Sequence, residues 1–140
     1  MIDLENYIFS YVASRLRNAH SGLSVQGEYI PTSKDFPLVT IEQKENAVKQ
    51  DWRTTKIENM VSVMFEVNTY SNKTKGRKEE AKALMAETDS YFAELGFTRT
   101  MLNPIPNLED STIYRLTARY EADIDLELVG TDEKYIIYQN

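Results

Sequence analysis

The sequence contains one histidine, His20, and histidine is the side chain that most often transfers protons in catalysis near neutral pH. No partner at a matching spacing accompanies it. The nucleophile-elbow, metalloprotease, phosphate-loop and dinucleotide-binding patterns are absent from the sequence. His20 follows a predicted helix, where a cation favours the negative end of the helix dipole. We therefore expect a capping or solvent-exposed histidine, no cofactor and no enzymatic activity.

Acidic residues alternate with apolar ones near the end of the chain, at Glu121, Asp123, Asp125 and Glu127. In an extended strand the last three would lie on one side, about 7 Å apart. Neighbouring carboxylates suit a hard cation such as Mg²⁺ or Ca²⁺, but a metal site needs ligands that converge from several elements. We expect a solvated acidic face and no metal.

Trp52 lies between Asp51 and Arg53, in the aperiodic segment 46–55 that we predict to be a loop or hairpin tip. Tryptophan and arginine are enriched among the residues that contribute most to binding at interfaces. Tryptophan is also often largely buried without any partner. Two interpretations stay open, contact of Trp52 with a partner or packing of Trp52 on the core.

Basic residues cluster around the predicted start of the second helix, at Lys73, Lys75, Arg77, Lys78 and Lys82. Such a cluster can contact phosphate groups. Positive charge is mildly unfavourable at the start of a helix, and Glu79 and Glu80 follow at once. We expect a solvated turn at this place.

Two helices and several strands are predicted from the spacing of the apolar residues. Apolar residues recur every three or four positions over 3–18 and 81–95, the second segment ending at Gly96. Alternation or apolar runs predict strands over 23–29, 37–44, 59–70, 97–102, 112–128 and 135–138. The strand over 97–102 should stop at Pro104 and Pro106, because proline cannot take part in a regular ladder. The strand over 112–128 would be about 55 Å long and must bend, break or project.

These elements predict the α+β class, with one mostly antiparallel sheet, two helices packed on one face, and extended loops or hairpins. The 140 residues fit a single domain, 1–140, and 41% hydrophobic residues predict a folded chain.

The absence of cysteine suits a reducing cytoplasm. A net charge of −6 opposes nonspecific binding of nucleic acid. The sequence shows neither a signal peptide nor an apolar stretch long enough to span a membrane.

Four blocks of sequence carry a resemblance to a known family: FPLVTIEQKEN, MFEVNTYSN, ELGFTRT and NPIPNLEDSTIYRLTARYEADID. In this order and spacing, over residues 36–125, they resemble the tail-terminator or minor tail proteins of long-tailed phages and prophages of Gram-positive bacteria. The resemblance implies a small α+β protein that assembles as a six-membered ring on the last ring of the tail tube. It further implies that the ring stops tube growth, presents a surface to the neck of the head, and has no active site.

The expected function is therefore that of a virion protein that caps the head-proximal end of the tail and is assembled in the host cytoplasm. The expected partners are other copies in a hexameric ring, the tail-tube protein, a head-completion or neck protein, and DNA that only passes through the lumen. No membrane partner is expected. A head-completion or stopper protein is the alternative, and a small enzyme or nucleic-acid-binding module is a more remote one.

The residues expected to contact partners form two groups. The first, expected at an interface, comprises Asp51, Trp52, Arg53, Arg115 and Arg119. The second, expected to face the lumen or the ring interface, comprises Glu121, Asp123, Asp125 and Glu127. Like charge in the second group would keep DNA from adhering.

Overall fold

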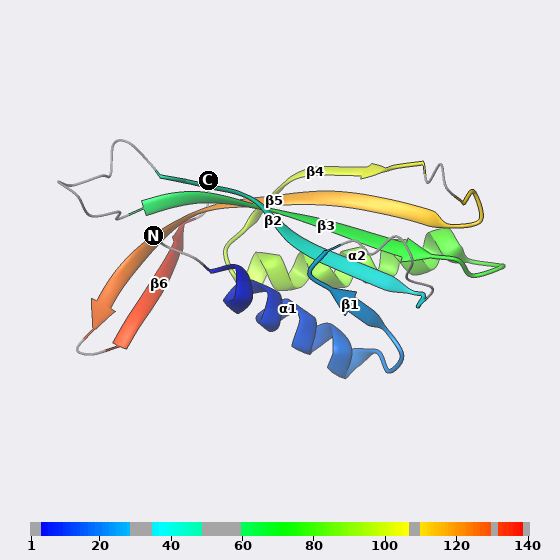
Figure 1. Ribbon diagram of the computed structural model, residues 1–140, viewed down its shortest axis with the longest axis horizontal. Coiled ribbons are helices and arrows are strands. Elements are labelled where there is room, and N and C mark those ends of the chain that lie inside the picture. The colour runs from blue at the N-terminus through cyan, green and yellow to red at the C-terminus, as the bar shows by residue number, and fades with distance from the viewer. Residues whose placement is uncertain (1–3, 29–34, 49–59, 107–109, 130–131, 139–140) are drawn as a thin grey trace.

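The computed structural model describes residues 4–28, 35–48, 60–106, 110–129 and 132–138 (Figure 1). Over these residues the chain forms two helices and six strands. In order, they are α1 (Glu5–Ala19), β1 (Ser24–Gln26), β2 (Leu38–Val48), β3 (Met60–Ser71), α2 (Arg77–Glu94), β4 (Thr98–Pro104), β5 (Tyr114–Val129) and β6 (Asp132–Tyr138).

All six strands belong to one sheet, in the order β1-β2-β3-β5-β4, with β6 also paired to β5. Only β1 and β2 are parallel, and every other pair is antiparallel. Strand β4 pairs with residues 116–121 of β5, and β6 pairs with residues 123–129. The predicted α+β class with a mostly antiparallel sheet is thus confirmed.

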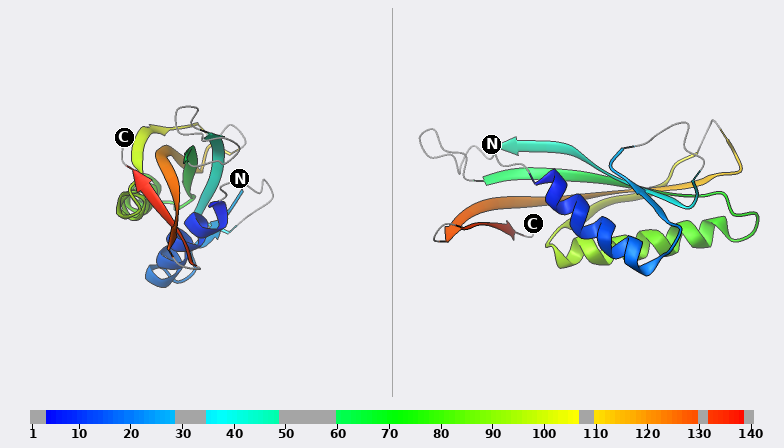
Figure 2. Two further views of the ribbon diagram at one scale, coloured as in Figure 1. Left: turned by 90° about the vertical axis from the view of Figure 1, so that its left-hand side faces the viewer. Right: turned by 60° about the horizontal axis from the view of Figure 1, so that its bottom comes forward.

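Both helices cover the same face of the sheet, as the views in Figures 1 and 2 show. Helix α1 buries Ile8, Val12, Ala13 and Leu16, and α2 buries Ala81, Leu84, Met85, Thr88 and Phe92, each set at the spacing of one helix face. Alternate residues of β3 point to these helices and are buried, namely Val61, Val63, Phe65 and Val67. At the centre of this core the ring of Phe92 stacks on Tyr120, with 4.5 Å between centroids and 6° between planes.

Helix α2 ends at Glu94, and Gly96, the glycine that the sequence predicts at this end, follows the C-cap residue Leu95. The φ of Gly96 is +90°, a left-handed conformation that costs a glycine little. The Gly96 N–H donates to Ala93 O, and the Phe97 N–H donates to Phe92 O at 3.0 Å, which is the pattern of a Schellman motif. The side chain of Phe97 then meets that of Phe92 edge to face, so the cap also fixes the start of the chain toward β4.

The predicted loop over 46–55 is wrong at its start, because residues 46–48 continue β2 and pair with residues 61–63 of β3. The register shifts between Gln43 and Glu45, and this irregularity interrupts the alternation on which the prediction depended. The remainder of that segment, from residue 49, lies outside the described residues.

Strand β4 also extends further than predicted, through Asn103 to Pro104. Proline cannot donate to a ladder, but it is tolerated on an edge strand, and β4 is at the end of the sheet order. Pro104 accordingly lies opposite Leu116, and the next N–H, of Ile105, donates to Arg115 O at 3.0 Å. Of the strand predicted over 23–29, only Ser24–Gln26 form β1 among residues 23–28, and residue 29 lies outside the described residues.

The longest predicted strand is continuous in the structure. Strand β5 has 16 residues, pairs with β3 from Tyr114 to Asp125, and bends before it forms a hairpin with β6 (Figure 1). The hairpin extends beyond both helices in Figure 1 and in the right-hand view of Figure 2. Of the three outcomes expected from its length, bending, breaking and projection, strand β5 shows bending and projection.

Candidate functional site

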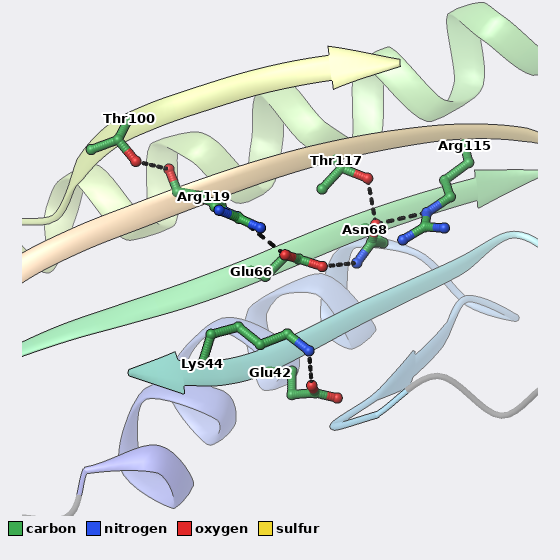
Figure 3. A network of polar contacts seen from close by, with 8 residues as sticks. All are labelled: Glu42, Lys44, Glu66, Asn68, Thr100, Arg115, Thr117 and Arg119. Carbon is green, nitrogen blue, oxygen red and sulfur yellow. Dashed lines mark hydrogen bonds and ion pairs between the residues drawn. The ribbon is translucent and has the colours of Figure 1, made fainter. Parts of the chain in front are cut away.

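The sheet face opposite the helices carries a group of polar side chains beside the buried Leu38 and Tyr70, and we call it the open face. Its side chains come from three neighbouring strands, β2, β3 and β5 (Figure 3), and comprise Glu42, Lys44, Glu66, Asn68, Arg115, Thr117 and Arg119. They stand on the open face because their neighbours in the alternation, such as Val67 and Tyr120, are buried under the helices.

Asn68 is the centre of a hydrogen-bonded network on the open face. Its Oδ1 accepts from Arg115 Nε at 2.9 Å and from Thr117 Oγ1 at 2.5 Å. Its Nδ2 donates to Glu66 Oε1 at 3.4 Å. Asn68 and Thr117 are only 6% and 3% exposed. Two largely buried polar side chains are thus satisfied by neighbours within the sheet.

The charges of the open face are also arranged in pairs. Glu42 and Glu66 lie opposite each other on β2 and β3, an arrangement of like charges that destabilises a sheet. A cation offsets each of them. Lys44 pairs with Glu42, and Arg119 Nε donates to Glu66 Oε2 at 3.2 Å. Arg119 keeps 45% of its side chain exposed, so this guanidinium also remains accessible to a partner.

Of the predicted interface residues, Arg115 and Arg119 both lie on the open face, four residues apart on β5. Arg115 is half-buried and places its guanidinium carbon 5.6 Å from the centroid of the Tyr70 ring. Asp51, Trp52 and Arg53 lie outside the described residues. Both interpretations of Trp52 therefore stay predictions.

The predicted acidic face is only partly described. Glu121 and Asp123 continue the alternation of Arg115 and Arg119 along β5, opposite Met64 and Ser62 of β3. Ser62 Oγ donates to Asp123 Oδ1 at 2.6 Å. Asp125 and Glu127 occupy the next alternate positions of the strand, but their side chains are not among those described.

His20 occupies the C-cap position of α1, where its backbone N–H donates to Leu16 O at 3.0 Å. Its side chain contacts α2, with Nε2 2.9 Å from Glu87 Oε1. The other oxygen of Glu87 accepts from the Tyr91 hydroxyl at 3.0 Å. The histidine thus joins the end of one helix to the middle of the other.

No three His, Cys, Asp or Glu side chains of the described part are grouped in a way that could hold a metal ion. Neither helix, over the residues described, is long and apolar enough to cross a membrane.

A second region, which the sequence analysis did not identify, is an open groove of about 450 Å³ between α2 and the end of β4. We call it the α2–β4 groove. Its apolar floor is formed by Met85, Leu102, Pro104, Tyr114 and Leu116. Its rim carries three cations, Lys78, Lys82 and Arg99.

Behind the groove a buried tyrosine is tied to a charged pair. The Tyr120 hydroxyl donates to Asp89 Oδ1 at 2.9 Å, and the same oxygen accepts from Arg99 at 3.2 Å. Burial, together with the hydrogen bond to Asp89, raises the pKa of Tyr120 well above its usual value. The hydroxyl therefore loses its proton less readily in the folded chain than in the unfolded one.

The open face could be partly foreseen, because alternation in β3 and β5 separates their polar and apolar sides. Fewer features of the sequence indicated the groove. Lys78 and Lys82 belong to the basic cluster that we predicted as a solvated turn, although both lie in α2. Leu102 is apolar but 40% exposed, which no local pattern indicates.

No protein-family model matches this chain, and a search of characterised proteins finds no significantly similar sequence. The function proposed below therefore depends on the geometry and on the sequence resemblance.

Proposed function

We propose that this chain is a non-catalytic structural subunit of a phage tail, a tail terminator that forms a ring at the head-proximal end of the tail tube. In this role the ring stops tube polymerisation and joins the tail to the neck of the head. The resemblance over residues 36–125 supplies the family. The observation that carries the proposal is the shape of the sheet.

The sheet offers more surface than its two helices cover. The helices pack on one face, while the other face carries the polar side chains of Figure 3, among which Lys44 and Arg119 keep 43% and 45% of their side chains exposed. The β5–β6 hairpin extends past the helices (Figure 1). A hairpin that leaves the core adds little to the stability of its own subunit, because a two-stranded ribbon alone is marginally stable. Contact with neighbours in an assembly gives such a hairpin a role.

The polar side chains also favour a structural role over catalysis. His20, the residue type best suited to proton transfer, is engaged with Glu87. The open-face residues Asn68 and Glu66 are engaged with cations or hydroxyls of the adjacent strand. Groups of this kind serve to hold strands and helices together.

A tube-capping assay tests the proposal. Purified tail-tube protein of the same phage would be polymerised with increasing amounts of this chain, and tube lengths measured by electron microscopy. We expect tubes to shorten and each to carry a ring at one end. Unchanged tube lengths would contradict the terminator role. Binding to filled heads without any effect on tubes would identify the stopper alternative instead.

A further inference from the structure

Two of the three cations on the rim of the α2–β4 groove have no acidic partner among the described residues. Lys78 and Lys82 are both exposed, and neither has an ion-pair partner within the part of the chain that the structure describes. They are four residues apart on α2, so the two ammonium groups repel each other. Arg99 already contacts Asp89 at 3.2 Å. The rim would therefore be stabilised by carboxylates from another molecule.

The floor of the groove is equally open. Leu102 is 40% exposed on β4, which is the edge strand of the sheet next to α2. Natural proteins usually cover or charge such an edge, because an open edge with apolar side chains can pair with other chains. An occupant of this groove should thus carry apolar side chains and acidic ones together.

The β5–β6 hairpin of the same chain has that composition. In sequence, positions 125–129 and 132–134 hold four acidic residues, three apolar residues and one basic residue, Lys134, which lies opposite Glu127 in the ladder. The acids are Asp125, Glu127, Asp132 and Glu133, and the apolar residues are Leu126, Leu128 and Val129. In a chain with 16 basic residues, this concentration of negative charge complements the groove rim.

A molecule cannot place its own hairpin in its own groove. Leu116 of the groove floor and Leu126 of the hairpin are ten residues apart on the same strand, roughly 30 Å at the usual rise. In Figure 1 the hairpin is at the left end of the molecule, while β4 ends and α2 begins toward the right. Contact between hairpin and groove therefore requires two molecules.

We infer that the α2–β4 groove binds the β5–β6 hairpin of a second copy of this chain. The contact joins two different surfaces, so repeated use closes a ring or extends a filament. The inference rests on the proposed function, for which it specifies how ring subunits join. It assigns Asp125 and Glu127 to the interface between subunits.

Disulfide trapping tests the contact directly, because the chain has no cysteine of its own. One batch would carry Leu102→Cys and a second Leu128→Cys, and the two would be mixed and oxidised. We expect a cross-linked dimer that contains one chain of each kind. The matched control replaces Leu102→Cys by Tyr7→Cys, since Tyr7 is 56% exposed on α1 and away from the groove. No mixed dimer, or as much with Tyr7→Cys, would overturn the inference.

Charge reversal tests the chemistry of recognition. Lys78→Glu with Lys82→Glu, or Asp125→Lys with Glu127→Lys, should each weaken self-association at least about tenfold in light-scattering or native mass measurements. A chain with all four substitutions should regain it. Circular dichroism and urea unfolding would verify that each variant is folded. Self-association that survives both reversals, or that the combined chain fails to regain, would contradict the proposed pairing.

The two levels of proposal can fail separately. Cross-linking between hairpin and groove in a chain that does not cap tubes would retain the interface and reject the tail function. Capping by a chain that gives no such cross-link would retain the tail function and reject the assignment of the groove.

Discussion

The open face of the sheet and the α2–β4 groove differ in how their charges are satisfied. On the open face Glu66 accepts from Asn68 and Arg119, and Asn68 accepts from Arg115 and Thr117. In the groove, Lys78 and Lys82 lie over an apolar floor and have no described ion-pair partner. Polar groups that hydrogen-bond to one another stabilise the folded subunit. Charged groups without an ion-pair partner in their own subunit can bind another molecule.

We therefore expect substitutions on the open face to lower the free energy of unfolding, and substitutions at the groove rim not to lower it. The largest effect is expected for Asn68→Ala. It leaves the half-buried Arg115 and the buried Thr117 without their shared acceptor, and should lower the free energy of unfolding by about 1–3 kcal/mol. Urea unfolding measures this change. Asn103→Ala, at an exposed position of β4, is the matched control and should change stability by less than about 0.5 kcal/mol.

Tyr120, behind the groove, should make the folded state sensitive to alkali. Because its pKa is raised on folding, the unfolded chain ionises this tyrosine above about pH 10 while the folded chain does not. Its contribution to stability is thus complete below about pH 10 and falls above it, by up to about 1.4 kcal/mol per pH unit.

Urea unfolding at several alkaline pH values, on the chain and on Tyr120→Phe, measures this dependence. The variant should lose the hydrogen bond to Asp89 at every pH but show a shallower alkaline decline. The remaining decline should come in part from Tyr11 and Tyr91, whose pKa values burial also raises. Parallel declines in the two proteins would show that Tyr120 is ionised in the folded state.

A smaller effect is expected for the ion pair of Arg119 and Glu66. Arg119 is half exposed, so the coupling energy in a double-mutant cycle of Arg119→Ala and Glu66→Gln should be about 0.2–1 kcal/mol. It should decrease in 1 M salt, since exposed charges are screened. A coupling that salt leaves unchanged would mean that this pair is more enclosed than its exposure indicates.

The smallest effect is expected at the groove. Lys78→Ala with Lys82→Ala removes a like-charge pair four residues apart on a helix, and should raise stability by about 0.2–0.5 kcal/mol. Thermal unfolding measures this change, with Lys75→Ala, outside α2, as the control. A clear loss of stability would place the two lysines among the groups that hold the fold.

Much of the architecture could be predicted because its signals are local. The alternation of Val61, Val63, Phe65 and Val67 depends only on the period of a strand, and the end of α2 depends on one glycine. The register between β3 and β5 depends on residues that are far apart in the sequence. Nothing near Glu66 in the sequence indicates that Arg119 lies opposite it, 53 residues away. The internal pairing of the open face therefore required the structure.

The groove escaped prediction for a related reason. Whether Leu102 is buried or exposed depends on how far α2 extends over the edge of the sheet, which is a property of helix packing and not of the segment TRTMLNP. Strand β4 was expected to stop at residue 102, and it includes Asn103 and Pro104 because an edge strand tolerates proline. Such features arise between elements, where periodicity carries no information.

Strand β5 belongs to both of the surfaces proposed to meet, since Tyr114 and Leu116 lie in the groove and residues 126–129 lie in the hairpin. The number of residues in β5 between them therefore sets the distance between the two surfaces. Inserting or deleting one residue between them would exchange the two faces of everything beyond it. Length variation in relatives of this chain should therefore occur outside β5, and changes within the strand should be substitutions that keep its alternation.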